Sequence, residues 1–137
     1  MRLSSGGLRV NGTFVSASDR DQKENFSAVS PREVLEKVAS LPISEWNYKD
    51  DPASRHVGPM AQDFHAAFGV GPDEKHIATV DADGVALAAI QGLNQKVEEQ
   101  AAALRAREAR IARLEAELVE LRNLLVQAVN SGNPTRQ

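Results

Sequence analysis

A serine and a lysine that lie five residues apart, Ser18 and Lys23, have the side-chain types that could together carry out a nucleophilic reaction. A serine hydroxyl attacks a carbonyl only when a base takes its proton. A lysine serves as that base only in its neutral form, which removal from water or a nearby cation favours. Serine and lysine are common, so their spacing alone does not establish a catalytic pair.

Other chemistries have less support. The chain has no cysteine, which excludes disulfides and thiolate chemistry. His56, His65 and His76 lie far apart without metal-ligand spacing, so we expect no metal and no cofactor. The net charge is -3 with both signs interspersed, which predicts no nucleic-acid partner. No run of about 18 apolar residues occurs, so we expect no membrane partner.

The composition favours helices. Aromatic residues make up 4% of the 137 residues and hydrophobic residues 42%, much of it alanine. We predict an α+β fold with a short β-rich N-terminal stub, a small mixed helix/strand domain, and a long C-terminal helix in a parallel coiled coil. The predicted boundaries are 1–17 for the stub of a larger β structure, 18–80 for the mixed domain, 81–130 for the coiled coil, and 131–137 for a flexible tail.

Turn and cap residues mark the expected elements. Asn11-Gly12 favours a hairpin turn between Leu8–Val10 and Thr13–Val15. Ser30 is the expected N-cap of a helix that Pro31 begins and Pro42 stops, with Glu33 completing a capping box. The apolar stripe of this helix consists of Val34, Leu35, Val38 and Leu41.

A strand and a second helix are expected next. Residues 43–48 predict a strand with Trp46 and Tyr48 on one face, and residues 50–55 predict an exposed polar loop. A helix from about Pro59 to Gly69 is expected to bury Met60, Ala61, Phe64, Ala67 and Phe68. Residues 77–80 are a candidate for a short strand.

A heptad repeat dominates the C-terminal part of the chain. The a positions are Ile90, Val97, Leu104, Ile111, Leu118 and Leu125, and the d positions are Leu93, Gln100, Arg107, Leu114, Leu121 and Ala128. Such a repeat over more than five heptads predicts a left-handed coiled coil. No second heptad segment exists for the helix to fold back on, so we expect self-association.

The residues flanking the repeat favour parallel helices. Arg110 at g can reach Glu115 at e of a neighbouring chain, and Glu117 can reach Arg122 in the same way. Each exposed pair contributes about 0.5 kcal/mol or less, so these pairs select register more than they stabilise. The a and d residues leave dimer and trimer open, and the segment 110–115 resembles a pattern of trimeric coiled coils. We predict a homotrimer.

Two polar residues interrupt the d positions. Gln100 and Arg107 lower the stability expected of an aliphatic seam. They either set the register, bind an ion at the axis, or are imperfections that the other layers tolerate.

The sequence around Ser18 and Lys23 resembles the Ser-Asp-Arg-x-x-Lys-x-Asn motif of a known family. This motif opens the intramolecular chaperone domain of phage endosialidases and other tail spikes, the S74 peptidase family. The segments that carry the resemblance are Ser18-Asp19-Arg20-Asp21-Gln22-Lys23-Glu24-Asn25, Pro31 to Leu41, Trp46-Asn47-Tyr48, Gly58 to Phe64, and Val80 to Ala86. They cover residues from Ser18 to about Leu93 in the family's order.

The resemblance implies a trimeric domain that helps an upstream β-helical or fibrous passenger in the same chain to assemble and then cuts itself off. By analogy Ser18 is the nucleophile and Lys23 the base, with the cut beside Ser18 among Ala17, Ser18 and Asp19. Gln22 departs from the family, where an apolar residue is common. The implied location is a phage tail assembled in the bacterial cytoplasm, with the domain released after cleavage.

Two other functions remain open at this point. One is a structural trimerisation tip that is never cleaved, and the other is a coiled-coil adaptor unrelated to fibres. Seventeen residues precede Ser18, too few for a functional passenger. We therefore expect either a shortened chain or a chaperone that is encoded apart from its fibre.

Overall fold

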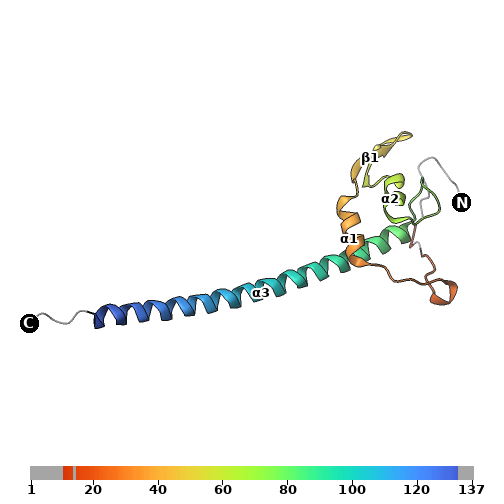
Figure 1. Cartoon of the computed structure of the whole chain (residues 1–137). Helices are drawn as coiled ribbons and strands as arrows, with labels where there is room; N and C mark the ends of the chain where they lie inside the picture. The colour runs from red at the N-terminus through yellow and green to blue at the C-terminus, as the bar shows by residue number, and fades with distance from the viewer. Residues whose placement is uncertain (1–10, 14, 133–137) are drawn as a thin grey trace, which may run out of the picture. The chain divides into compact units, whose positions relative to one another are not determined.

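The computed structural model describes residues 11–13 and 15–132 (Figure 1). The elements in chain order are η1 (Arg20–Gln22), α1 (Pro31–Ser40), β1 (Ser44–Tyr48), β2 (Asp51–Gly58), α2 (Ala61–Phe68) and α3 (Thr79–Ser131). The fold is therefore mixed helix and strand with a long C-terminal helix, as predicted. The chain divides into two units, Met1–Leu93 and Asn94–Gln137.

Helix α1 begins and ends where its sequence predicts. The Ser30 hydroxyl accepts a hydrogen bond from the Glu33 amide at 3.4 Å, and Pro31 occupies the first turn. The helix ends before Pro42, at Leu41. Its predicted apolar residues, Val34, Leu35, Val38 and the capping Leu41, are half-buried, as is Pro31.

The predicted loop at residues 50–55 is wrong, because Asp51–Gly58 forms strand β2. It pairs antiparallel with β1, Trp46 lying opposite His56, and the register shifts between Trp46 and Tyr48. The Trp46 and His56 rings stack with centroids 4.7 Å apart, and Arg55 pairs with Glu45 across the strands. These cross-strand contacts stabilise a strand whose own sequence is typical of a turn-prone loop.

Helix α2 supplies the largest buried side chain of the described residues. Phe64 is 5% exposed, and its ring centroid lies 4.9 Å from that of Phe68. Gly69 ends the helix with φ 65°, the left-handed conformation that glycine adopts without strain. The prediction that Met60 is buried is wrong: this N-cap residue is 40% exposed, because it precedes the helix face that packs inward.

Helix α3 starts earlier than predicted. Thr79 and Val80 form its first turn, so the short strand expected at 77–80 is wrong. Asp81 in the first turn interacts favourably with the N-terminal end of the helix dipole. The helix then continues without interruption to Ser131, as the heptad repeat predicts. No helix in the described part of the chain is long and apolar enough to cross a membrane.

The hairpin predicted at residues 8–15 lies mostly outside the described residues. Residues 11–13 and 15–17 form no helix or strand, and Gly12 has φ 140°. The tail predicted at 131–137 likewise lies mainly outside, since the description ends at Gly132.

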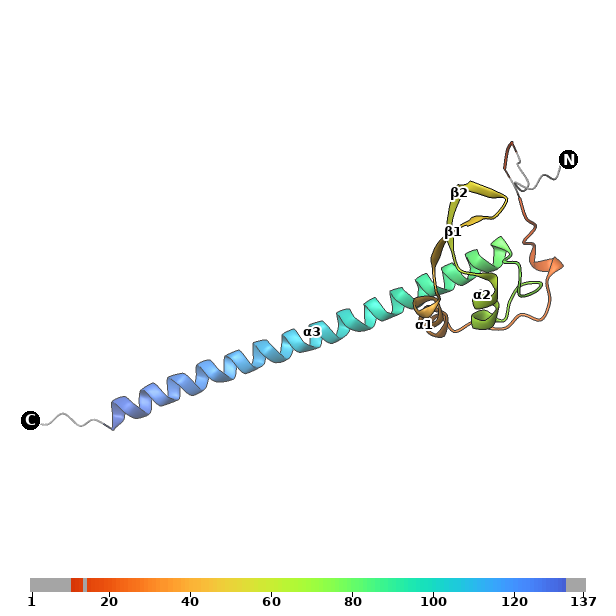
Figure 2. The ribbon, with the colours of Figure 1, turned by 90° about the horizontal axis from the view of Figure 1, so that it is seen from above.

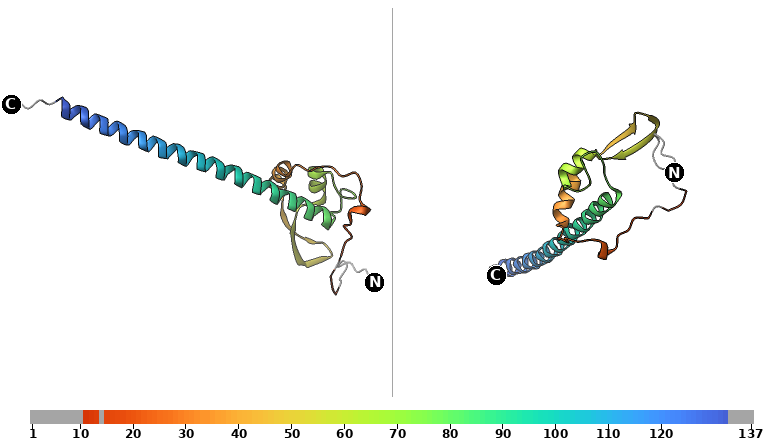
Figure 3. Two further views of the ribbon diagram at one scale, coloured as in Figure 1. Left: turned by 90° about the horizontal axis from the view of Figure 1, so that it is seen from below. Right: turned by 90° about the vertical axis from the view of Figure 1, so that its right-hand side faces the viewer.

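Helix α1 approaches the first part of α3 very closely at Gly92. The views from above and from the side both show α1 next to the first part of α3 (Figures 2 and 3). A Cβ atom on Gly92 would clash with the Pro31 carbonyl oxygen and would lie 3.0 Å from Leu35 Cβ. Gly92 and Ala89 are the buried residues of α3 within the described chain, so this crossing depends on small side chains.

We expect Gly92→Ala to lower the thermal stability of the first unit, because the added methyl must displace the α1 backbone at a cost of about 1–3 kcal/mol. The matched control is Gly84→Ala in the same helix, where a Cβ meets nothing within 4 Å. That control is expected to leave the melting temperature unchanged or raise it. Equal melting temperatures for the two variants, measured by circular dichroism, would contradict this packing.

Candidate functional site

A one-turn 3-10 helix, η1, joins Ser18 to Lys23. The Asp19 carboxylate accepts a hydrogen bond from the Asp21 amide at 3.0 Å and caps the turn. The Gln22 amide donates to the Asp19 carbonyl at 3.2 Å, and the Lys23 amide donates to the Arg20 carbonyl at 3.1 Å. These three bonds reverse the chain within five residues, so the side chains at its two ends can meet.

The turn brings the two predicted catalytic side chains into contact. Lys23 Nζ donates a hydrogen bond to Ser18 Oγ over 2.7 Å. This distance lies within the range of a nucleophile and its base. The structure thus places together the two residues that the sequence motif singled out.

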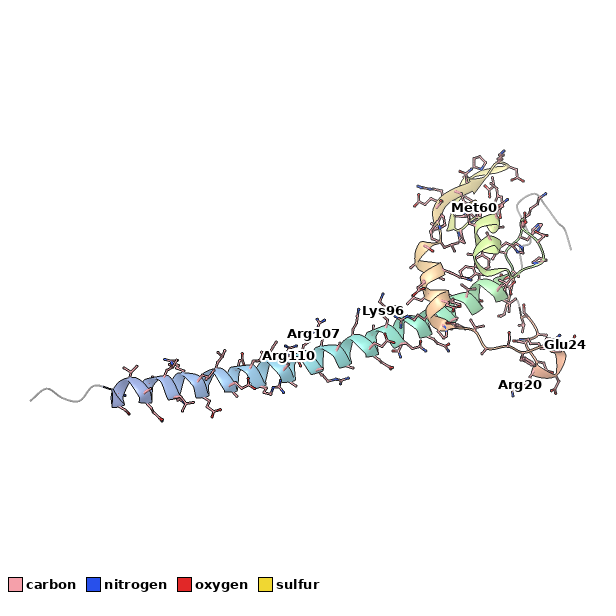
Figure 4. All side chains as sticks on the ribbon, in the orientation of Figure 1. Arg20, Glu24, Met60, Lys96, Arg107 and Arg110 are labelled. Carbon is pink, nitrogen blue, oxygen red and sulfur yellow. The ribbon has the colours of Figure 1, made fainter. Side chains whose placement is uncertain are left out.

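The pair lies on the surface. Ala17, Ser18, Asp19 and Lys23 are all exposed in the single chain, as is every residue of η1. An ammonium donates to a hydroxyl, whereas the neutral amine accepts the hydroxyl proton, and exposure to water favours the ammonium. Figure 4 shows Arg20 and Glu24 side chains on the same turn. The geometry is therefore suited to the reaction, which requires the amine of Lys23 in its neutral form.

The structure gives two residues of this site a role that the sequence analysis does not predict. Asp19 is a predicted cleavage position, and its side chain also caps η1. Asn25 has φ 56°, the left-handed conformation that asparagine tolerates better than most residues. An Asx residue directly before a short polar turn is the sequence signal that could have identified the Asp19 cap.

A second polar cluster precedes α3. The Asp73 carboxylate accepts the Lys75 amide at 2.7 Å and pairs with His76 Nδ1 at 2.9 Å. The hydrogen bond from the Lys75 amide, and to a lesser extent the one to the His76 ring, hold the pKa of Asp73 below its usual value. The contacts close an exposed turn, and among the described residues no group of three or more His, Asp or Glu side chains could hold a metal ion.

The residues predicted for the coiled-coil seam are exposed in the single chain. In the first unit they are Ile90 and Leu93, and in the second unit they are Val97, Leu104, Ile111, Leu114, Leu118, Leu121 and Leu125. They repeat along one uninterrupted helix, α3. An apolar stripe of this length on a single helix has no partner within the described chain.

Comparison with protein families assigns part of the chain. Residues 18–74 match the model of the peptidase S74 family, described as the chaperone of endosialidase. The match begins at Ser18, the first residue of the Ser–Lys pair. The match ends at residue 74, before α3 begins. It is therefore shorter than the segment from Ser18 to about Leu93 over which the sequence resembles the family. No curated protein and no solved structure matches the chain.

We expect Asp19→Ala to loosen η1, because the Asp21 amide loses its acceptor; losing a helix cap costs about 0.5–2 kcal/mol. Hydrogen–deuterium exchange of a peptide spanning residues 18–25 should become faster. Asp19→Asn keeps a capping oxygen and is expected to exchange like the unaltered chain. Equal protection in all three proteins would show that the cap does not hold the turn.

Proposed function

We propose, from the premise that residues 18–74 belong to the endosialidase-chaperone family, that the chain trimerises, assists the folding of a phage tail spike or fibre, and then releases itself by autoproteolysis. The observation that carries this proposal is the 2.7 Å contact between Ser18 and Lys23, at the residue where the family match begins.

The proposed reaction uses these two side chains in sequence. Neutral Lys23 takes the proton of the Ser18 hydroxyl while Oγ adds to the carbonyl carbon of the bond beside Ser18. The tetrahedral intermediate collapses, the C–N bond breaks, and the lysine ammonium gives its proton to the leaving nitrogen. Water then hydrolyses the ester, which frees the hydroxyl and leaves a carboxylate and an amine.

The exposure of the pair indicates when the reaction would occur. A lysine acts as a base after it loses its proton, and removal from water favours that loss. In the single chain both side chains are exposed. We therefore propose that neighbouring copies or the folded passenger cover the pair, so that cutting follows assembly.

The exposed surface supports association of copies. A compact monomer of this mass exposes about 7,000 Å², whereas the chain exposes 12336 Å². The a and d residues of α3 are the apolar side chains that a parallel partner helix would cover. Arg110 and Glu117 would then meet Glu115 and Arg122 of the neighbouring copies.

A trimeric helper is useful to a fibrous passenger for a physical reason. Interchain pairings in a trimeric fibre are slow to form and prone to misregister. A coiled coil would hold three chains in register and raise their effective concentration to about the millimolar range. Cleavage afterwards would make assembly irreversible, because the released passenger keeps its kinetic stability.

A second candidate is a structural trimerisation tip with the same fold and no cleavage. The observation in its favour is that Ser18 and Lys23 are exposed, with Asp19, Asp21 and Glu24 close by in the sequence. The two candidates differ in whether the mature protein keeps its first residues.

We expect intact mass spectrometry of the purified protein to show the loss of an N-terminal piece. If the cut precedes Ser18, 17 of the 137 residues leave, or about 1.8 kDa of 14.8 kDa. Ser18→Ala should remain uncut while it folds and assembles normally, because only the nucleophile is removed. Cutting that persists in this variant would refute the assignment of Ser18.

The same measurement separates the two candidates. The new N-terminal residue identifies the broken bond, Ala17–Ser18 or Ser18–Asp19. An unaltered chain that stays whole even when fused to its folded passenger would leave the structural tip as the function. Lys23→Met, which keeps an unbranched side chain one atom shorter and has no amine, is expected to match Ser18→Ala.

We expect Ile111→Asp to dissociate the assembly, because three carboxylates would enter one apolar layer without partners. Sedimentation equilibrium measures the change. The matched control is Ala112→Asp, an identical charge at the next residue on the outer face of α3. An Ile111→Asp protein that remained trimeric would show that the heptad register is assigned wrongly.

A further inference from the structure

Arg107 interrupts the apolar stripe of α3 at a d position, between Leu104 and Ile111. Figure 4 labels it on the helix together with Arg110. A guanidinium stays charged in proteins, so it cannot become neutral when an interface covers it. It therefore needs a carboxylate wherever its layer is buried.

The helix itself offers Arg107 no such partner. Side chains three or four residues apart are neighbours on a helix. At these positions stand Ala103 and Leu104 on one side and Arg110 and Ile111 on the other. None is acidic, and Arg110 adds a like charge. A counter-ion for Arg107 must come from another chain.

Coiled-coil geometry identifies that counter-ion. In a parallel assembly, a d side chain enters a hole formed by four residues of the facing helix: an a, the d, the following e, and the next a. For Arg107 these are Leu104, Arg107, Glu108 and Ile111 of the neighbouring copy. Glu108 is the one carboxylate among them.

Glu108 is free of the usual competitor for its charge. An e residue normally meets the g residue five positions earlier on the neighbouring helix. For Glu108 that residue is Ala103, which carries no charge. On the described helix, Gln100, Ala103, Leu104 and Arg107 line a shallow hollow. The small Ala103 side chain therefore leaves room beside Arg107 for Glu108, whose other cationic neighbour is the exposed Arg105 three residues earlier on its own helix.

We propose that Arg107 of each copy forms an ion pair with Glu108 of the neighbouring copy, which makes a ring of three interchain pairs inside the coiled coil. This inference rests on the proposed parallel trimer and goes beyond it, because it gives the polar layer a partner and a role. The ring balances three guanidinium groups with three carboxylates. Three unpaired guanidinium groups at the axis would oppose assembly.

The ring also fixes the register of the helices. A slip of one heptad towards the N-terminus would set Arg107 beside Ala101 and leave it unpaired. A slip towards the C-terminus would set Arg107 beside Glu115 but would bring Arg110 against Arg122. The aligned register alone pairs both arginines with carboxylates. Such specification by a single polar layer is a known use of buried polar groups in coiled coils.

The test is a charge swap in the full chain, with assembly followed by sedimentation equilibrium and helix content by circular dichroism. Arg107→Glu and Glu108→Arg each place like charges together and are expected to raise the dissociation constant by at least ~100-fold. Arg107→Glu adds a favourable pair with Arg110 on its own helix, so lost assembly cannot stem from a weakened helix. The double variant has the parent's composition and should restore assembly to within about threefold of the parent.

Matched controls carry the same charge changes on the outer face. Arg113→Glu and Glu120→Arg lie at c positions of the same helix, more than one turn away from Arg107 and Glu108, and we expect both to assemble like the parent. Single swaps that assemble like these controls would overturn the ion pair, as would a double variant no tighter than the singles. A parent chain that is monomeric would instead overturn the proposed trimer, and the ring with it.

Discussion

One chain of this protein buries too little apolar surface to account for its own structure. Among the described residues, Phe64 and Ala89 are the buried hydrophobic side chains, while the aliphatic residues of the α3 seam are exposed. Burial of apolar area is the main favourable contribution to folding. The proposed association of copies through α3 would supply the missing burial, and the roles proposed for the other features of the molecule depend on it.

The Ser18–Lys23 pair illustrates the dependence. Hydrogen bonds within six residues bring the two side chains together, so their contact needs no partner chain. The chemistry differs, because a lysine base has to lose a proton that water stabilises. A site with preformed geometry and an exposed base is suited to a reaction that waits for assembly. This order would protect an unfinished trimer from losing its helper.

In the proposed trimer, two groups of residues on α3 would have different roles. The aliphatic layers would supply an attraction that is much the same in several registers. The charged residues would distinguish those registers, because a slipped pairing brings like charges together or leaves Arg107 without a carboxylate. Gly92 has a comparable role within the first unit, where its lack of a side chain allows α1 to approach α3. Stability and specificity thus come from different residues.

Features that depend on short-range interactions could be predicted from the sequence. The Ser30 cap, the Gly69 helix end, the long helix of the heptads and the Ser18–Lys23 motif all involve residues within one or two turns of each other. Only the tertiary structure showed that Asp51–Gly58 is a strand, that Met60 is exposed and that Gly92 packs against Pro31. The reason is physical: strand β2 is stabilised by partners on β1, and Gly92 meets a helix sixty residues earlier in the chain. No local pattern carries that information.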